Sequence, residues 1–582
     1  MIIIDGLLPR DMPDGRQIAA EGRDLGREIT VGVSALCEMY QVRSEVEYKR
    51  KMRDQGRFMT AFNIGMKTWD DTARALESIH TNCEQRGFRI DRYQMQLDRR
   101  MGLPESLWNS APKETGPMLE NREQWQSIAH VVPIQPHLGD MMIGSPASVR
   151  NTAHALEAGV SYIGNMSQFN WRYPAWLGDD VEQMAEMVKA LGLMASKVDD
   201  GAMVHSYLDD GYPAQFKDFC SYIGWSMFER HVVDHCIGAR VSISYGGLTH
   251  NPATKAAMIL AIEALTPDDA CNAFFHSNTT GYSLDTDANF GVVSLDDLYM
   301  MLAQQRARSF AATMSVPVTE PIRIPTWEEI VQVQTVAHRV AAEAQRLMDT
   351  VDWPGIEENR DRLLDGGRRF FENLMQGLDE LGIDTEDPLQ LLVAVRRLGA
   401  PTIENRFGVG SPPVDDTSLY QPEVATDTFL DFLERRNQVR GVLLNDPIRS
   451  TDSGCRVIVG STDIHEYALF LLIEALRTLQ VETVVAGTSV DPNEFADLAL
   501  EANASAIFIT THNGMALTYA KNLLDELRDR GLSTPVAMGG TLNQDAPGES
   551  APVDVAEELS TLGIRVCNQI TDVADVVRGH TS

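Results

Sequence analysis

The sequence lacks the cysteine patterns that define disulfide frameworks and structural zinc sites. Its seven cysteines are scattered over 582 residues, and no two of them form a Cys-x-x-Cys pair. Scattered thiols in odd number are typical of a reducing compartment. The sequence also lacks an apolar run of the roughly 18–20 residues that a transmembrane helix requires, and its start has neither the basic segment nor the cleavage site of a secretory signal. We therefore expect a soluble, cytoplasmic protein without a membrane partner.

Basic residues are also scarce. The chain has 50 Lys and Arg against 83 Asp and Glu, which gives a formal net charge of -33. Nucleic-acid backbones and anionic membranes attract basic surfaces, so this charge argues against both as partners. Hydrophobic residues make up 43% of the chain, and at this length we expect about two to four domains with their own cores.

Hydrophobic patterning divides the chain into four predicted zones. Residues 1–57 form a polar, partly helical N-terminal segment, and residues 58–325 alternate short β-rich runs with longer amphipathic stretches. That alternation predicts an α/β barrel or an open parallel sheet, and the length favours a TIM (β/α)8 barrel. Residues 326–450 read as a helical extension and linker. The predicted strands of the second zone are 128–134, 161–164, 240–244, 273–276 and 311–316.

The last zone, residues 451–582, has the most regular pattern. Near-continuous apolar strands with helices between them predict a parallel sheet covered on both faces, in a doubly wound domain of flavodoxin-like size. We expect its ligand beyond the carboxyl ends of the strands. The predicted strands are 456–460, 482–487, 504–510, 535–539 and 565–568.

Three short motifs follow predicted strands of this zone. Asp463 and His465 follow the first strand, Thr510 ends the third, and Gly539 and Gly540 end the fourth. An imidazole at a strand end stands where a sheet ligand would dock, and an Asp two residues earlier can accept the ring's second N–H and fix its tautomer. Asp-x-His alone is also common in surface loops, and Gly-Gly alone is a turn.

Together these motifs resemble the "base-off/His-on" class of cobalamin-binding domains found in glutamate mutase, methylmalonyl-CoA mutase and methionine synthase. The resemblance implies that His465 is the metal ligand on cobalt and that Asp463 supports it. The residues that it assigns to the cofactor are Ser461, Asp463, His465, Thr510, Gly514, Gly539 and Gly540. The sequence departs from the family pattern at Ala468, where the family has Gly, and at His512, where it has Leu.

Residues of about 45–440 resemble, at a distant level, the catalytic subunit of glutamate (methylaspartate) mutase. The resemblance rests on the order of segments 90–93, 245–249, 274–276, 289–292 and 320–326, none of them specific alone. It implies a TIM barrel, adenosylcobalamin as cofactor, and a homodimeric assembly. In that family, homolysis of the cobalt–carbon bond starts a radical rearrangement of the substrate.

The resemblance and the local sequence also suggest roles for single residues in this zone. Glu320 matches an acid that binds the adenosyl ribose, and Tyr245 lies in a cofactor-facing segment. His276 is a candidate acid, base or hydrogen-bond donor, Arg172 a candidate anion contact, and Tyr173 lies near the family's substrate-contacting tyrosines. Each of these residues also has an ordinary structural explanation, as a surface or core side chain.

The family's three substrate-binding arginines are replaced here. Their positions fall at Ile64, near Met95 and at Met142. A buried carboxylate without a guanidinium or equivalent partner costs several kcal/mol, so we do not expect glutamate to be held in the family's way. We therefore expect an adenosylcobalamin-dependent carbon-skeleton mutase acting on another small acid or acyl compound. A cobalamin-dependent methyltransferase and a non-catalytic cobalamin carrier or sensor remain open.

Overall fold

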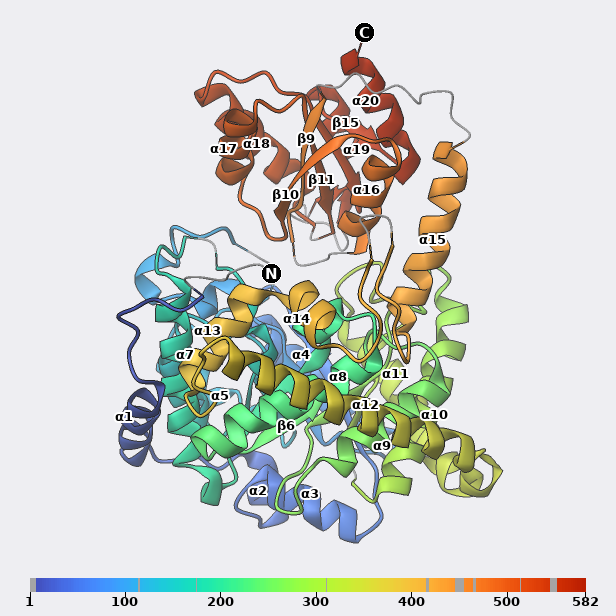
Figure 1. Ribbon diagram of the computed structural model, residues 1–582. Helices are drawn as coiled ribbons and strands as arrows, with labels where there is room; N and C mark the ends of the chain where they lie inside the picture. The colour runs from blue at the N-terminus through green and yellow to red at the C-terminus, as the bar shows by residue number, and fades with distance from the viewer. Residues whose placement is uncertain are drawn as a thin grey trace. The chain divides into compact units, whose positions relative to one another are not determined.

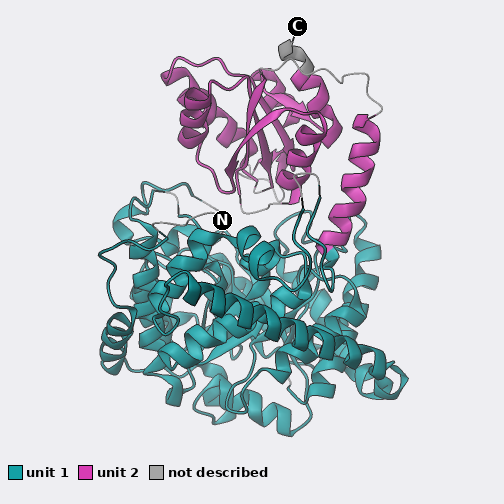
Figure 2. Cartoon of the chain, viewed as in Figure 1, with its two compact units in different colours: residues 1–427 teal, residues 428–582 magenta. Residues whose placement is uncertain are grey.

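The computed structural model describes most of the chain. The described residues are 7–113, 116–173, 175–309, 311–414, 418–444, 455–463, 467–512, 514–544 and 552–581. The chain divides into two compact units, Met1–Asp427 and Thr428–Ser582 (Figure 2). The sequence-based boundary at 450/451 falls in a stretch, 445–454, that lies outside the described residues. None of the helices in the described part is both long and apolar enough to cross a membrane.

Unit 1 alternates strands and helices along the chain (Figure 1). Its strands are β1 Met59–Ile64, β2 Arg92–Met95, β3 Gln135–His137, β4 Tyr162–Gly164, β5 Met203–Tyr207, β6 Val241–Ser244, β7 Phe274–His276 and β8 Ala312–Met314. The helices that follow them in turn are α4 Trp69–Gln85, α5 Arg122–Ser127, α6 Ser148–Glu157, α7 Asp180–Ala195, α8 Phe219–Arg230, α9 Pro252–Ala264, α10 Thr286–Ala307 and α11 Trp327–Leu347. Three further helices precede β1: α1 Gly15–Arg27, α2 Ala35–Tyr40 and α3 Glu45–Asp54.

The strands of unit 1 form two parallel sheets that are connected to each other. One has the order β3-β2-β1-β8-β7 and the other β4-β5-β6. Isolated parallel bridges join Leu138, after β3, to Ile163 of β4, and Tyr245, after β6, to Phe275 of β7. Because all strands run parallel, their carboxyl ends lie at one end of these sheets.

Most predicted strands of this zone are confirmed, and one is wrong. Predicted strands 161–164, 240–244, 273–276 and 311–316 correspond to β4, β6, β7 and β8. Residues 128–134 form turns and bends instead. The backbone N–H groups of His130 and Val131 both bond to the Ser127 oxygen, so the chain extends the last turn of α5. The apolar side chains there, including buried Ile128 and Ile134, fill the core from a loop.

The helical extension predicted after residue 326 is also present. Besides α11 it contains α12 Trp353–Glu380, α13 Pro388–Leu398 and α14 Ala400–Phe407, all within unit 1. Thr326 and Glu329 form a reciprocal capping box at the start of α11, which explains why the helix begins there. Gly224 of α8 and Gly367 of α12 allow these two helices to approach closely, since a Cβ at Gly224 would stand 2.6 Å from the Gly367 oxygen.

Unit 2 is a five-stranded parallel sheet between two layers of helices (Figure 1). The strand order β10-β9-β11-β12-β15 is flavodoxin-like, consistent with the doubly wound domain that the sequence pattern predicted. The strands are β9 Arg456–Ser461, β10 Glu482–Gly487, β11 Ala506–Thr511, β12 Val536–Gly540 and β15 Arg565–Cys567, with a small antiparallel pair β13 Asn543–Gln544 and β14 Val553–Asp554. The helices are α15 Asp427–Leu444, α16 Tyr467–Thr478, α17 Pro492–Ala502, α18 Ala516–Asp529, α19 Ala556–Thr561 and α20 Val573–Thr581.

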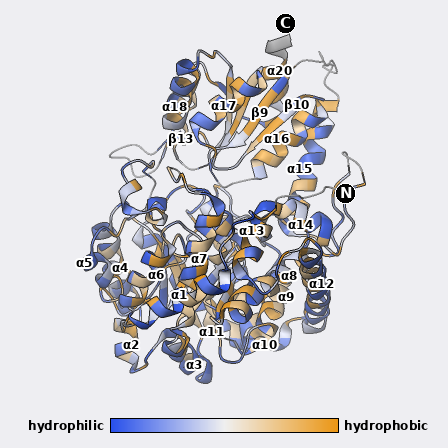
Figure 3. Cartoon of the chain, turned by 60° about the vertical axis from the view of Figure 1, so that its left-hand side comes forward, coloured by the Kyte–Doolittle hydropathy of each residue, from blue (hydrophilic) through white to orange (hydrophobic). Residues whose placement is uncertain are grey.

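Alternate residues of the central strands build two separate cores. Val457 and Val459 of β9 pack with Leu472 of α16 on one face, and Ile458 packs with Phe495 of α17 on the other. Successive side chains of a strand point to opposite faces, so a strand buried on both sides needs a continuous apolar run. Figure 3 shows this hydrophobic colouring of the strands in unit 2.

Candidate functional site

The carboxyl edge of the unit 2 sheet brings predicted residues into one row. Thr510 of β11 pairs in register with Ser461 of β9 on one side and with Gly539 of β12 on the other. Thr511 pairs with Gly540 in the next row. Ligands of doubly wound sheets bind beyond these strand ends. The pairing register of β9, β11 and β12 therefore brings segments that are far apart in the sequence together at one candidate binding edge.

Asp463, directly after β9, is held by two other loops of this edge. Its backbone oxygen accepts the N–H of Ser489, after β10, at 3.0 Å. Its Oδ2 accepts the backbone N–H of His512, after β11, at 2.6 Å. Asp463 is 7% exposed, so its carboxylate is fixed and mostly withdrawn from water. His465 lies outside the described residues, so its bond to Asp463 and its role as metal ligand stay predictions.

This edge of the sheet presents hydroxyl groups, and backbone without side chains at the two glycines, to a ligand. Thr510 Oγ1 is buried and has no hydrogen-bond partner among the described residues, and the same holds for Ser489 Oγ. Ser461 Oγ accepts the Asp463 N–H at 3.3 Å, which leaves its own O–H able to donate. Gly539 and Gly540 add no side chains beside these hydroxyls. A buried hydroxyl without a partner is costly unless a ligand or water completes it, so this edge fits a ligand with polar groups.

Gly540 is required by the backbone itself. Its φ of 100° is a conformation that side chains disfavour, and a Cβ there would stand 2.4 Å from the Thr511 oxygen. Gly514, another predicted cofactor residue, has a φ of 72° in the turn before α18. Both glycines thus have structural reasons for their identity, beside the contacts predicted from the sequence.

The two departures from the cobalamin motif also have defined places. His512 Nδ1 lies 2.7 Å from the hydroxyl of Thr541, which follows β12. The imidazole thus replaces the apolar family residue with a polar bridge between two loops of the edge. Ala468 lies in the first turn of α16 and is half-buried.

Comparison with known proteins agrees with this geometry. Residues 455–560 match the family model of the B12 binding domain. The C-terminal unit contains a B12-binding domain. The prediction of a cobalamin-binding domain is therefore confirmed at the level of the family. A cobalamin-binding protein from Desulfitobacterium hafniense DCB-2 is similar in structure with a TM-score of 0.19 and 14% sequence identity. The match covers 22% of this chain and 60% of that protein, so the chain spans less than two thirds of its length. No curated protein matches the chain.

Unit 1, which precedes the B12-binding domain, places His276 at the carboxyl end of β7. Asn63 of β1 lies with its Nδ2 3.2 Å from His276 Nε2, and His276 Nδ1 lies 2.6 Å from the Ser277 oxygen. A carbonyl only accepts, so Nδ1 carries the proton and Nε2 accepts from Asn63. Burial lowers the pKa of His276 to about 4. His276 is therefore a neutral imidazole at pH 7.

A group of acids and amides that sequence reasoning missed lies at the same end of the strands. We call it the polar cluster, and its members are Gln94, Asp140, Asn165, Gln168 and Asp210. Gln168 Nε2 donates to Asp140 Oδ1 at 2.6 Å and to Asp210 Oδ2 at 3.2 Å. Gln94 Nε2 donates to Asp140 Oδ2 at 3.4 Å, and Asn165 Nδ2 to Asp210 Oδ2 at 3.0 Å. Sequence patterning gave no signal, because the five residues follow or end four different strands.

Burial perturbs both carboxyl groups of the polar cluster, and the two carboxyl groups also hydrogen-bond each other. Burial raises the pKa of Asp140 to about 6. Burial, followed by the charge of Asp140, raises the pKa of Asp210 well above its usual value. Neighbouring carboxylates that resist ionisation together are typical of functional sites, although structural networks show them too.

Tyr245 and the two glycines that follow it shape the loop after β6, at the carboxyl ends of the unit 1 strands. Tyr245 is fully buried, and its hydroxyl donates to Thr249. Gly246 has a φ of 134°, and a Cβ there would stand 2.3 Å from the His276 oxygen. The Gly246 N–H donates to Asp209 Oδ2 at 2.9 Å. The motif at 245–247 thus allows the loop after β6 to pass close to His276.

The other predicted residues of unit 1 differ in burial. Glu320 is exposed in a turn after β8, with its N–H bonded to the Pro317 oxygen at 3.1 Å. The Arg172 side chain is exposed, whereas Tyr173 is buried with its ring 5.6 Å from the Arg99 guanidinium. Their catalytic and cofactor roles stay predictions.

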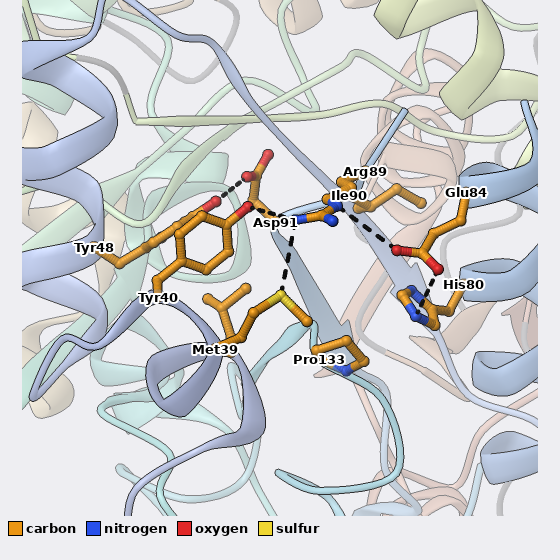
Figure 4. Close-up of a pocket in the computed structure, with 10 residues that line it drawn as sticks. Met39, Tyr40, Tyr48, His80, Glu84, Arg89, Ile90, Asp91 and Pro133 are labelled. Atoms are coloured by element: carbon orange, nitrogen blue, oxygen red, sulfur yellow. Dashed lines mark hydrogen bonds and ion pairs between the residues drawn. The ribbon is translucent and has the colours of Figure 1, made fainter. Parts of the chain in front are cut away.

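A small pocket lies at the opposite ends of the strands (Figure 4). Asp91, which precedes β2, accepts from Tyr48 and, at 2.9 Å, from the Thr60 N–H. Glu84 in the same pocket lies 3.6 Å from both Arg89 and His80. These polar groups satisfy one another, which is typical of a structural rather than a ligand-binding pocket.

Proposed function

We propose that this chain is an adenosylcobalamin-dependent carbon-skeleton mutase, an isomerase acting on a small acid or acyl compound other than glutamate. In this proposal the strands of unit 1 close into a TIM (β/α)8 barrel, for which the two bridges between its parallel sheets are the support. The observation that carries the proposal is the set of buried polar side chains at the carboxyl strand ends of unit 1. Active sites of barrel enzymes lie at that end, and a carrier or sensor of cobalamin has no need of them.

In this proposal the predicted cofactor residues of unit 2 hold the cobalamin at the carboxyl edge of the sheet. When bound, adenosylcobalamin supplies the radical that starts the rearrangement by removing a hydrogen atom from the substrate. His465 holds the cobalt, and Asp463 fixes the orientation of its ring. The hydroxyls of Ser461 and Thr510 bind polar groups of the cofactor. The glycines at 514, 539 and 540 keep side chains out of its way.

Residues of unit 1 bind and orient the substrate. His276, neutral and with Nε2 directed to Asn63, exchanges that bond for one to the substrate. Glu320 and Tyr245 serve the adenosyl group, while Arg172 and Tyr173 contact the substrate from the loop after β4. Burial of this region limits the access of water to reactive species. A homodimer is the proposed assembly.

A methyltransferase is the second candidate, and one observation disfavours it. That class would need a helical cap directly before the cobalamin motif. Of the described helices before β9, α12, α13 and α14 belong to unit 1, and α15 alone belongs to the same unit as the B12-binding domain. A non-catalytic carrier or sensor would not explain the buried polar groups at the carboxyl strand ends of unit 1.

Reconstitution separates these functions. The full chain is loaded with adenosylcobalamin or with methylcobalamin, and electron paramagnetic resonance is recorded while candidate acids are added. A radical signal that requires adenosylcobalamin and one particular acid supports the mutase. Methyl transfer without a radical signal would overturn it in favour of the methyltransferase, and binding of cobalamin without either reaction would favour the carrier.

A further inference from the structure

A buried ion pair is connected to His276 through the backbone. Lys255 of α9 and Asp296 of α10 form this pair, with Nζ and Oδ2 2.6 Å apart and side chains that are 0% and 1% exposed. Lys255 Nζ also donates to the backbone oxygen of His276 at 3.1 Å. A fully buried ion pair adds little to stability by itself, because taking both charges out of water is costly. Its contact with a candidate substrate residue therefore suggests another role.

Asp296 also holds the peptide unit that follows Ser277. Its Oδ2 accepts the backbone N–H of Asn278 at 2.7 Å. The peptide bond between Ser277 and Asn278 is trans, so its N–H and its C=O point in opposite directions. The Ser277 oxygen therefore points away from Asp296, and it lies 2.6 Å from Nδ1 of His276. One peptide unit thus connects the carboxylate to the imidazole.

This connection selects one tautomer of His276. A carbonyl oxygen only accepts, so Nδ1 carries the proton and Nε2 keeps its lone pair. Asn63 Nδ2, 3.2 Å from Nε2, is a donor that fits this assignment. Burial lowers the pKa of His276 to about 4, and the charge of Lys255 also lowers it, so the ring is neutral at pH 7. In Ser-His-Asp triads an Asp fixes the tautomer by a direct bond, whereas here a peptide unit stands between acid and ring.

We propose that Asp296 is a positioning residue that makes His276 a hydrogen-bond acceptor toward the substrate. Nε2 then accepts from an O–H or N–H group of the substrate and cannot donate to a carbonyl or carboxylate oxygen. Lys255 offsets the burial of the Asp296 carboxylate and holds the carbonyl group of His276. The inference rests on the proposed function, in which His276 contacts the substrate.

The natural protein tests the tautomer first. The full chain is labelled with 15N-histidine, and the signals of the His276 ring are assigned by their loss in His276→Gln. Protonated and unprotonated ring nitrogens differ in their 15N chemical shifts. We expect a protonated Nδ1 and an unprotonated Nε2 at pH 7. A protonated Nε2, or averaging between the two tautomers, would overturn the inference without any further variant.

Two double variants test the role of Asp296, and both remove the ion pair so that no charge stays buried alone. Lys255→Met with Asp296→Asn keeps a side-chain oxygen for the Asn278 N–H and should keep the tautomer. Lys255→Met with Asp296→Leu removes that acceptor and should shift the tautomer ratio of His276 about tenfold toward a protonated Nε2. Asp296→Ala in place of Leu makes the same test with a smaller side chain. Circular dichroism verifies folding, and an unchanged tautomer in the folded Leu or Ala variant would overturn the role of Asp296.

Ser277→Ala is the matched control in the same loop. The Ser277 hydroxyl donates to Oδ1 of Asp297 at 2.7 Å and takes no part in the peptide connection. This variant should leave the tautomer of His276 unchanged. An equal change of tautomer in Ser277→Ala and in the Leu double variant would indicate general loosening of the loop, and it would overturn positioning by Asp296.

The inference and the proposed function fail in distinguishable ways. A protonated Nδ1 that depends on Asp296, without a radical signal from any candidate compound, supports the positioning of His276 and overturns the mutase. A radical signal that requires adenosylcobalamin, together with a protonated Nε2 of His276, supports the mutase and overturns the positioning role.

Discussion

The backbone N–H of His512 donates to the Oδ2 of Asp463 over 2.6 Å, across the carboxyl edge of the B12-binding domain. This bond connects the loop after β11 to the loop that leads into His465. A carboxylate that accepts a buried N–H is held in one orientation. The side chain expected to orient the cobalt ligand is thus itself oriented by a neighbouring loop.

Asp463→Ala should loosen both loops. The His512 N–H would lose its charged acceptor, at a cost of about 1–3 kcal/mol. We expect faster hydrogen exchange at the His512 amide, measured by NMR or mass spectrometry, and weaker cobalamin binding. Asp463→Asn keeps an acceptor oxygen and should fall between Ala and the natural residue. Equal exchange rates in all three proteins would show that this bond does not stabilise the edge.

His465→Ala should remove the axial histidine from cobalt. The visible spectrum of the bound cofactor would then change from that of a histidine-ligated form to that of a base-off form. His512→Ala is the matched control, because His512 bonds to Thr541 at the same edge and is not the expected ligand. A spectrum altered by His512→Ala and not by His465→Ala would reverse the assignment.

Gly540→Ala should destabilise the B12-binding domain by more than the ordinary cost of a positive φ. The methyl group would meet the Thr511 oxygen at 2.4 Å, in addition to a backbone cost of about 1–3 kcal/mol. Gly531→Ala is the control, since Gly531 has a φ of 70° and no atom lies within 4 Å of the place that its Cβ would take. Hydrogen exchange of β11 and β12 measures the difference between the two variants. Similar losses in both would show that the clash relaxes without cost.

His276 should make unit 1 less stable in acid. Its pKa of about 4 in the folded protein lies below the unfolded value of 6.5, because burial disfavours the imidazolium. The unfolded state therefore binds the proton more readily, and stability present above pH 6.5 falls as pH is lowered toward 4. The loss attributable to His276 is about 3 kcal/mol at most.

His276→Gln should remove this part of the pH dependence. All eight tryptophans lie in unit 1, so urea unfolding followed by tryptophan fluorescence reports on that unit. The difference between the natural protein and the variant should shrink from pH 7 to pH 4. His130→Gln alters an exposed imidazole and serves as the control. A difference that stays constant with pH would show that His276 is not buried in its neutral form.

Local sequence determined much of the B12-binding domain. Val457, Ile458 and Val459 are continuously apolar because alternate faces of β9 enter two cores. The motif that includes Asp463 and Gly540 could be recognised from the sequence because its residues directly follow or end continuously apolar strands. The strand prediction at 128–134 was wrong because apolar residues in a buried loop have the same composition as a strand.

By itself, then, the sequence determined the order of elements, the apolar strands and the motif that follows β9. Only the tertiary structure decided which side chains meet. Strand register set Thr510 between Ser461 and Gly539, and the loop after β3 brought Asp140 to Gln94 of β2 and to Asp210 after β5. Periodicity encodes which face of an element is buried, whereas contacts between distant segments depend on register and loop paths that no local pattern specifies.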